Sequence, residues 1–190
     1  FFLAVTSVFV VISFFPFYWQ LITALKPPEQ VFSMPPSWWP NRLYMDNFVE
    51  VFRSQPFFDF IRNSFIVSGM VTLFCLVIGS MAAYAIARLR VRGNHLMLYS
   101  ILAVAIFPQV SVVSPLFLVF KELDWLNTYQ ALIIPYIAFN LPLTIWILTS
   151  FFSDIPSELE ESAKVDGCNS IQAMVKIILP LTVPALFTVA

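Results

Sequence analysis

The sequence predicts an all-α fold, a polytopic transmembrane helical bundle, and three observations lead to this prediction. Hydrophobic residues make up 59% of the 190 residues, and the mean hydropathy is +0.84. Charged residues make up only 11%, whereas an average globular domain has about 25%. Four apolar stretches are each long enough to cross a bilayer, for which a helix needs about 20 residues. These observations argue against a soluble domain.

Four complete spans and the start of a fifth, near Leu181, are expected. The four cover residues 1–25, 63–87, 96–120 and 129–152. Because the chain starts and stops inside apolar runs, we expect a single transmembrane domain over 1–190 that is incomplete at both ends. None of the four spans contains Asp, Glu, Lys, Arg or His. Ion-driven carriers and pumps generally need ionisable groups in the membrane, so we expect the energy source to lie elsewhere.

Prolines interrupt three of the spans, and each one removes a backbone donor and bends its helix. These prolines are Pro16, Pro108, Pro115, Pro135 and Pro142. The bends fit either irregular helix packing or the lining of a curved cavity.

Arginines indicate which side of the membrane is cytoplasmic. Arg88, Arg90 and Arg92 lie close together at the end of the second span, and cytoplasmic loops carry an excess of basic residues. This orientation places residues 153–180 in the cytoplasm. The net charge of −1 gives no electrostatic basis for binding nucleic acid.

The polar segment 153–180 lies between two apolar runs and carries most of the functional information. Ser157 and Glu160 have the spacing of a capping box, and Gly167 stands where a helix ends in a left-handed residue. These signals predict a helix over 158–166, which is too short to be stable alone. We therefore expect it to pack against another part of the protein or against a partner.

A second short helix is predicted over 170–179, with Pro180 at its end. Its apolar residues fall on one face: Ile171, Met174, Val175 and Ile178. Two short helices joined at a glycine would form an elbow, with one arm free to enter a groove on a partner. An ordinary cytoplasmic loop is the alternative interpretation.

The same segment resembles the EAA loop of the membrane subunits of ATP-binding-cassette (ABC) importers. The family pattern is Glu-Ala-Ala, three residues, Gly, nine residues and then Ile-x-Leu-Pro. Here Glu161 opens the pattern, Gly167 and 177–180 follow at the same spacing, and Ser162 replaces the first alanine. The chain looks most similar to maltose-type sugar permeases, with further similarity at 82–93, 107–117 and 126–129 and a partial match over 33–52.

This resemblance implies the type I importer permease fold, in the inner (plasma) membrane of a bacterium and surrounded by membrane lipid. It implies a sugar permease that works with a second permease subunit, two ABC ATPase subunits and an external solute-binding protein. The substrate would be a di- or oligosaccharide or a related sugar. Residues 153–180 would form the cytoplasmic coupling loop. The ATPase-coupling residues would be Glu160, Glu161, Ser162, Ala163, Asp166 and Gly167.

The sequence contains no motif for nucleotide binding or catalysis. No glycine belongs to a G-x-x-x-x-G-K-[ST] loop, which would be needed to cradle phosphates. We therefore expect no cofactor on this chain, with ATP and Mg²⁺ bound by the partner ATPases. His95 is the only histidine, and Cys75 and Cys168 have no disulfide or metal spacing, so no catalytic or metal-binding residue is predicted. An intramembrane enzyme that uses the acidic loop, or an ion-coupled carrier or channel, are the alternative functions.

Polar residues near the prolines are candidates for the substrate path, because a sugar cavity needs hydrogen-bonding groups and aromatic faces. They are Gln109, Ser111, Ser114, Tyr136 and Asn140. Hydrogen bonds between helices of the bundle are the alternative role for each of them.

Overall fold

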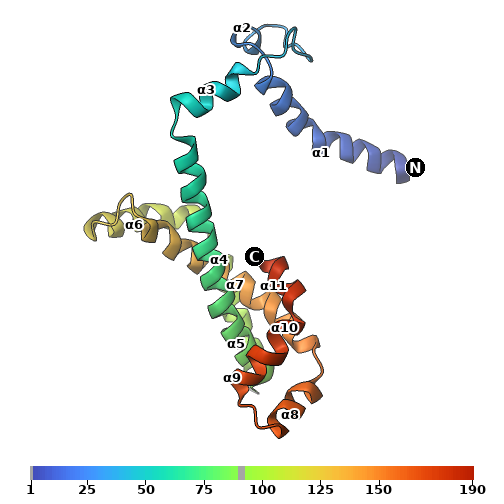
Figure 1. Ribbon diagram of the computed structural model, residues 1–190, viewed down its shortest axis with the longest axis vertical. Coiled ribbons are helices and arrows are strands. Elements are labelled where there is room, and N and C mark those ends of the chain that lie inside the picture. The colour runs from blue at the N-terminus through green and yellow to red at the C-terminus, as the bar shows by residue number, and fades with distance from the viewer. Residues whose placement is uncertain (1, 90–92) are drawn as a thin grey trace. The chain divides into compact units, whose positions relative to one another are not determined.

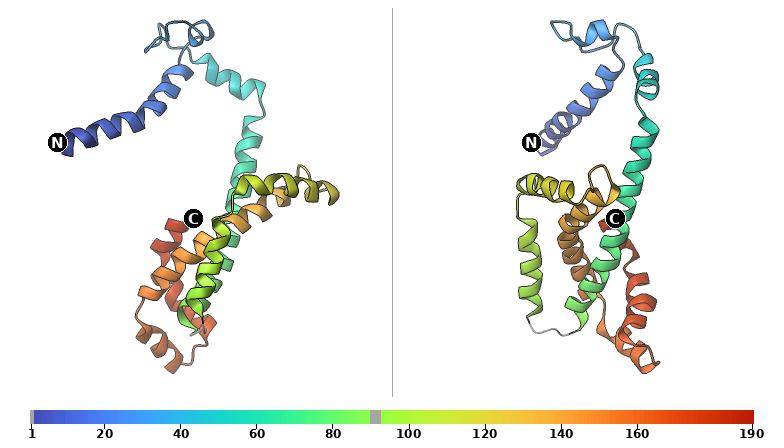
Figure 2. Two further views of the ribbon diagram at one scale, coloured as in Figure 1. Left: turned by 180° about the vertical axis from the view of Figure 1, so that it is seen from behind. Right: turned by 90° about the vertical axis from the view of Figure 1, so that its left-hand side faces the viewer.

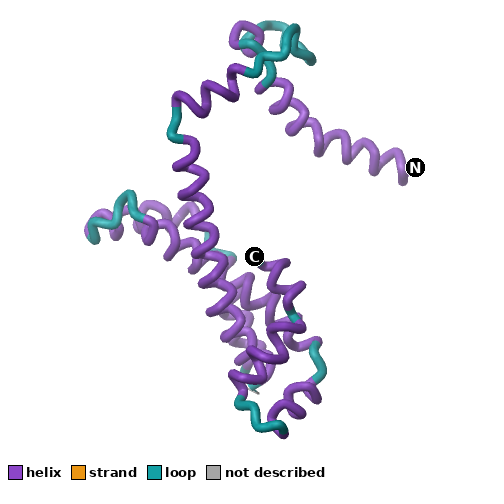
Figure 3. Tube along the Cα trace, in the orientation of Figure 1, coloured by secondary structure: helices purple, strands orange, loops and turns teal. Residues whose placement is uncertain are grey.

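The computed structural model describes residues 2–89 and 93–190. Within these two ranges the chain forms helices and loops and no strand (Figure 3), which confirms the all-α prediction. The chain packs as two compact units, Phe1–Asn63 and Ser64–Ala190. A single domain over 1–190 stays a prediction. Arg90 and Arg92, on which the orientation partly depends, lie outside the described residues.

The first unit contains three helices: α1 (Phe2–Ala24), α2 (Pro28–Val31) and α3 (Asp46–Ser54). α1 is apolar along its length and includes Pro16. The side chain of Asn47 donates hydrogen bonds of 2.9 Å to the carbonyls of Ala24 and Lys26. These two carbonyls lie at the end of α1, where the helix itself offers them no donor. Asn47 therefore fixes the start of α3 to the end of α1.

The second unit contains most of the long helix α4 (Phe57–Arg88) and all the helices that follow it (Figure 1). These are α5 (Asn94–Ala105), α6 (Gln109–Glu122), α7 (Tyr129–Asp154), α8 (Ser157–Val165), α9 (Ser170–Ala173), the π-helix η1 (Met174–Ile178), α10 (Leu179–Leu181) and α11 (Val183–Val189). α5 and α11 both pack against α7, and Figure 2 shows these helices from two further sides.

Three helices in the described part of the chain are long and apolar enough to cross a membrane. They are Val5–Ala24, Phe57–Arg88 and Tyr129–Asp154. Two bent pairs raise the number to five if each pair is one span: α5 with α6, bent by 77°, and Ser170–Leu181 with Val183–Val189, bent by 78°.

The expected third span, 96–120, is therefore not one helix. The chain turns between Ala105 and Gln109, because Pro108 has no amide hydrogen and disfavours helical backbone at Phe107. The other prolines within predicted spans are accommodated inside helices: Pro16, Pro115, Pro135 and Pro142.

The core of the second unit lies where α4, α7 and the C-terminal helices meet. Its buried members are Ala83, Tyr84, Leu148, Phe152, Met174, Ile178 and Ala185. Farther along α4, Gly79 lies directly against α7: a Cβ at Gly79 would be 2.6 Å from Cγ2 of Thr144. Small residues let membrane helices approach closely, and here only glycine leaves room for Thr144.

The segment after Gly167 differs from the predicted helix 170–179 in two ways. It is an α-turn, then the π-helix η1, then α10, and the chain bends at Thr182 rather than stopping at Pro180. Of the four residues predicted to share one apolar face, Ile171 and Val175 are 67% and 51% exposed, whereas Met174 and Ile178 are buried. The π-turn holds more residues than an α-turn, so an α-helical period places the face incorrectly.

Candidate functional site

The C-terminal end of α8 follows the sequence prediction closely. Gly167 has a φ of +87°, a left-handed backbone that glycine adopts without strain. The Cys168 amide donates to the Ala163 carbonyl at 2.9 Å, and the Gly167 amide donates to the Lys164 carbonyl at 3.1 Å. This pair of bonds is a Schellman motif, which ends the helix and turns the chain toward α9.

The N-terminal end of α8 does not follow the prediction. Among the described residues no side chain caps the helix, and its N-cap position is Pro156, so the predicted capping box of Ser157 and Glu160 is wrong. A capping box forms instead at the start of α9. There the Asn169 side chain accepts from the Gln172 amide, and the Gln172 side chain accepts from the Asn169 amide.

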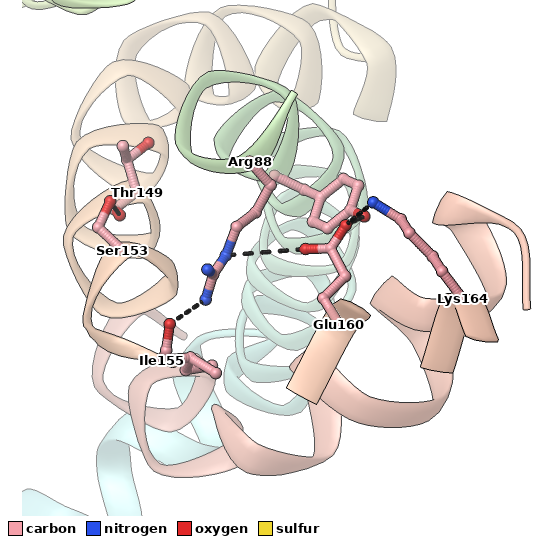
Figure 4. Close-up of polar contacts among 7 residues, drawn as sticks. Arg88, Thr149, Ser153, Ile155, Glu160 and Lys164 are labelled. Carbon is pink, nitrogen blue, oxygen red and sulfur yellow. Dashed lines mark hydrogen bonds and ion pairs between the residues drawn. The ribbon is translucent and has the colours of Figure 1, made fainter. Parts of the chain in front are cut away.

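Glu160 turns into the protein, where it forms what we call the Glu160 cluster with Tyr84, Arg88 and Lys164 (Figure 4). The Tyr84 hydroxyl donates to Glu160 Oε1 at 2.7 Å, within the buried part of the second unit. Lys164 Nζ lies 2.7 Å from the same oxygen, and Arg88 Nε lies 4.0 Å from Oε2. The Glu160 and Arg88 side chains are 6% and 9% exposed, whereas Lys164 is 46% exposed. The carboxylate therefore joins α8 to the end of α4.

Arg88 also contacts the connection between α7 and α8. Its guanidinium donates through Nη2 to the carbonyl of Ile155, as the dashed line in Figure 4 shows. One arginine thus holds both the end of α7 and, through Glu160, the helix that follows it.

The Glu160 cluster keeps its carboxylate charged. Burial raises the pKa of Glu160, but hydrogen bonds from Lys164 and Tyr84 and the positive charges of Lys164 and Arg88 outweigh this effect. The pKa therefore lies below its ordinary value of 4.5, because groups that stabilise the ionised form lower the pKa of an acid.

The predicted coupling residues separate onto opposite faces of α8. At about 100° per residue, Glu160 and Ala163 share one face, and both are buried. Glu161 and Ser162 lie on the opposite face and are exposed, together with Glu158 and Val165, and Val165 is 87% exposed. Asp166 and Gly167 are exposed at the C-terminal end.

Tyr84, Arg88 and Lys164 are the residues of this site that sequence reasoning did not assign to it. Lys164 follows Glu160 by one helical turn on α8. Tyr84 and Arg88 belong to the stretch 82–93 that resembles the permease family, and they stand one helical turn apart at the end of the predicted second span. A tyrosine hydroxyl and an arginine at the same end of an apolar helix need polar partners when they are buried. This requirement indicates that Tyr84 and Arg88 have a polar partner, but it does not identify the acidic residue.

The structure does not gather the predicted substrate-path residues into one place. Gln109, Ser111 and Ser114 lie on α6, and Tyr136 and Asn140 lie one turn apart on α7; all five are exposed. The Asn140 side chain donates to the Tyr136 carbonyl at 2.7 Å. None of them lines the cavities of about 300 Å³ and 390 Å³ in the second unit. The substrate path stays a prediction.

The chain matches a known protein family over more than half of its length. Residues 75–190 match the family described as binding-protein-dependent transport system inner membrane component. The chain belongs to this family. The matched region contains α8 and all four residues of the Glu160 cluster. The match also confirms the inner-membrane location that the resemblance implied.

Named permease proteins are similar to this chain over nearly its whole length. The trehalose/maltose transport system permease protein MalG of Thermococcus litoralis is 40% identical over 183 residues, which are 95% of this chain and 65% of that protein. The sulfoquinovosyl glycerol transport system permease protein SmoH of Agrobacterium fabrum is 39% identical, over 96% of this chain and 64% of that protein. The chain spans just under two thirds of the length of these relatives.

A solved structure confirms the fold. A chain from the crystal structure of a bacterial ABC transporter involved in the import of the acidic polysaccharide alginate matches with a TM-score of 0.77 and 21% identity. The match covers 98% of this chain and 65% of that one. The all-α membrane bundle predicted from the sequence therefore has the fold of a chain of an ABC importer.

Proposed function

We propose that this chain is the permease subunit of an ATP-driven, binding-protein-dependent importer of sugars. The names of its relatives support a sugar or sugar derivative as the substrate, since they include trehalose/maltose and sulfoquinovosyl glycerol permeases. A trehalose permease, SugB of Mycobacterium tuberculosis, is a further relative at 38% identity. A di- or oligosaccharide or a related molecule is the substrate class that fits all three names.

The observation that carries the proposal is the exposed face of α8. Glu161 and Ser162 lie on it, and Asp166 and Gly167 stand at its end, within the loop that has the EAA spacing. We propose that this face sits in a cleft of an ABC ATPase. The carboxylates would offer partners for basic side chains of the ATPase, and Val165 would offer an apolar contact at the centre of the interface.

In this proposal the chain itself performs no catalysis and holds no cofactor. Two ATPase subunits bind ATP and Mg²⁺, and their closure moves α8 and so switches the bundle between inward-open and outward-open states. A second permease subunit completes the pathway, and an external solute-binding protein delivers the sugar. The absence of a G-x-x-x-x-G-K-[ST] motif and of charged residues from the predicted spans supports this division of labour.

The test uses the full-length permease, reconstituted with its second permease, ATPases and binding protein in liposomes. Sugar-stimulated ATP hydrolysis and ATP-dependent sugar uptake are measured with maltose and trehalose. Glu161→Lys reverses a charge on the exposed face of α8 and is expected to release the ATPase, whereas Glu122→Lys, a charge reversal on α6, should not.

Two results would support the alternative functions instead. Uptake that persists without ATP and collapses with the proton gradient would indicate an ion-coupled carrier. A chemical activity of the subunit without any ATPase would indicate an intramembrane enzyme.

A further inference from the structure

α8 is poorly held by apolar packing. It has nine residues, of which only Glu160 and Ala163 are buried. Beside Leu159, an apolar recess of about 390 Å³ separates α8 from α10 and α11. Helices of this length are marginal in isolation, so the position of α8 depends strongly on the few contacts that it does make.

The Glu160 cluster supplies the strongest of these contacts. Hydrogen bonds to a charged group are about twice as strong as those between neutral groups, and Glu160 receives one from Tyr84 in a buried setting. Arg88, at 4.0 Å from the other carboxylate oxygen, adds an ion pair between two nearly buried side chains. Removing one partner of such a pair leaves an uncompensated buried charge, which opposes separation.

Tyr84 and Arg88, the partners of Glu160 on α4, are held rigidly. Tyr84 is 4% exposed and packs in the core of the second unit with Leu148 and Phe152 of α7, which are both fully buried. Arg88 binds the Ile155 carbonyl at the end of α7. Close-packed cores transmit displacement because they do not compress. A movement of α8 that keeps the Glu160 cluster intact must therefore carry the ends of α4 and α7 with it.

We propose that Tyr84, Arg88 and Glu160 are positioning residues that transmit the displacement of α8 into α4 and α7. This inference rests on the proposed function, and it gives two neighbouring carboxylates different roles. Glu161 faces the ATPase, whereas Glu160 faces inward and holds α8 to the bundle. Lys164, which is half-exposed, covers the outer side of the Glu160 carboxylate.

The decisive measurement is the number of sugar molecules imported per ATP hydrolysed by the reconstituted complex of the full-length permease. Tyr84→Phe removes one hydrogen bond and keeps the ring in the core. Glu160→Gln removes the charge and keeps the side-chain shape. Tyr99→Phe on α5 and Glu122→Gln on α6 are matched controls, because both side chains are exposed and neither lies on the proposed docking face of α8.

Both cluster variants are expected to keep the ATPases bound and to hydrolyse ATP while the import ratio falls at least about tenfold, the lower limit of the equilibrium factor that corresponds to one charged hydrogen bond. The two controls should keep the wild-type ratio. A purely structural role would lower stability and all activities together and leave the ratio unchanged.

An unchanged ratio in Tyr84→Phe and Glu160→Gln would overturn the proposal. Loss of ATPase binding by folded Tyr84→Phe would overturn it as well, because Tyr84 would then act on docking rather than on transmission. If the wild-type complex shows no ATP-dependent uptake, the proposed function fails instead, and this result is distinct from both of the others.

Discussion

Replacing Gly79 by alanine tests the close approach of α4 and α7. The new Cβ would lie 2.6 Å from Thr144 Cγ2, and moving Cγ2 away would disturb the hydrogen bond of 3.1 Å that the Thr144 hydroxyl donates to the Asn140 carbonyl. Overpacking of this kind typically costs about 1–3 kcal/mol. Alanine also gains about 0.5–1 kcal/mol over glycine in a helix, so the useful reference is a glycine on the same helix without a neighbour.

Gly69 is that reference, because among the described residues nothing apart from its chain neighbours and the backbone of its own helix lies within 4 Å of its ideal Cβ position. Gly69→Ala should be neutral or slightly stabilising, and Gly79→Ala should be about 1–3 kcal/mol less stable than Gly69→Ala. For a chain of this length that difference corresponds to about 2–12 °C in melting temperature. The assay is thermal unfolding of the detergent-solubilised permease.

Thr144→Ser supplies the rescue, since it deletes Cγ2 and keeps the hydroxyl that donates to the Asn140 carbonyl. The nearest remaining contacts of the new Cβ would be 3.5 Å and 3.8 Å, which are ordinary distances. Gly79→Ala combined with Thr144→Ser should therefore recover most of the lost stability. The reasoning is refuted if Gly79→Ala matches Gly69→Ala, or if Thr144→Ser brings no recovery.

Three further predictions concern α8 and the residues that follow it. Gly167→Val should lower the free energy of unfolding by about 1–2 kcal/mol through the left-handed backbone alone, since a side chain there would have open space. Gly167→Asn should lower it clearly less, and the midpoints of chemical denaturation of the two variants measure the difference. Because the pKa of Glu160 is lowered by folding, its contribution to stability is complete above about pH 4.5 and is lost as the pH falls through the lower folded-state pKa. Thermal melts of wild type should therefore lose more stability below pH 4.5 than those of Glu160→Gln, and parallel pH profiles would contradict this. Asn169→Ala removes the cap of α9 and should cost about 1 kcal/mol, measured as faster hydrogen exchange at the amides of α9; unchanged exchange at the Gln172 amide would contradict it.

The sequence predicted those parts of the fold that depend on composition and on local signals. Apolar stretches placed the spans, and the left-handed Gly167 ended α8 as expected, because a helix end is specified by a few adjacent residues. Pro108 was recognised as a point of bending. Its bend of 77° was not predicted, because the angle depends on what α5 and α6 pack against.

Two predictions for residues 157–179 were wrong for different physical reasons. Glu160 has the local spacing for a capping box, but it binds Tyr84, which lies 76 residues away. A buried hydroxyl and a nearby arginine stabilise a carboxylate more than one exposed amide does, and no local pattern shows that this partner exists. The apolar face predicted over 170–179 is only partly buried, because the π-helix over Met174–Ile178 departs from the α-helical period.

The different surroundings of Glu160 and Glu161 have a practical consequence. A water-soluble carbodiimide modifies carboxylates that solvent can reach, so Glu161 should react in every state in which the ATPase is absent. Glu160, one residue away, becomes reactive only when α8 lifts from the bundle. The ratio of the two modifications within a single peptide would therefore report the detachment of α8, with Glu161 as the internal standard for Glu160.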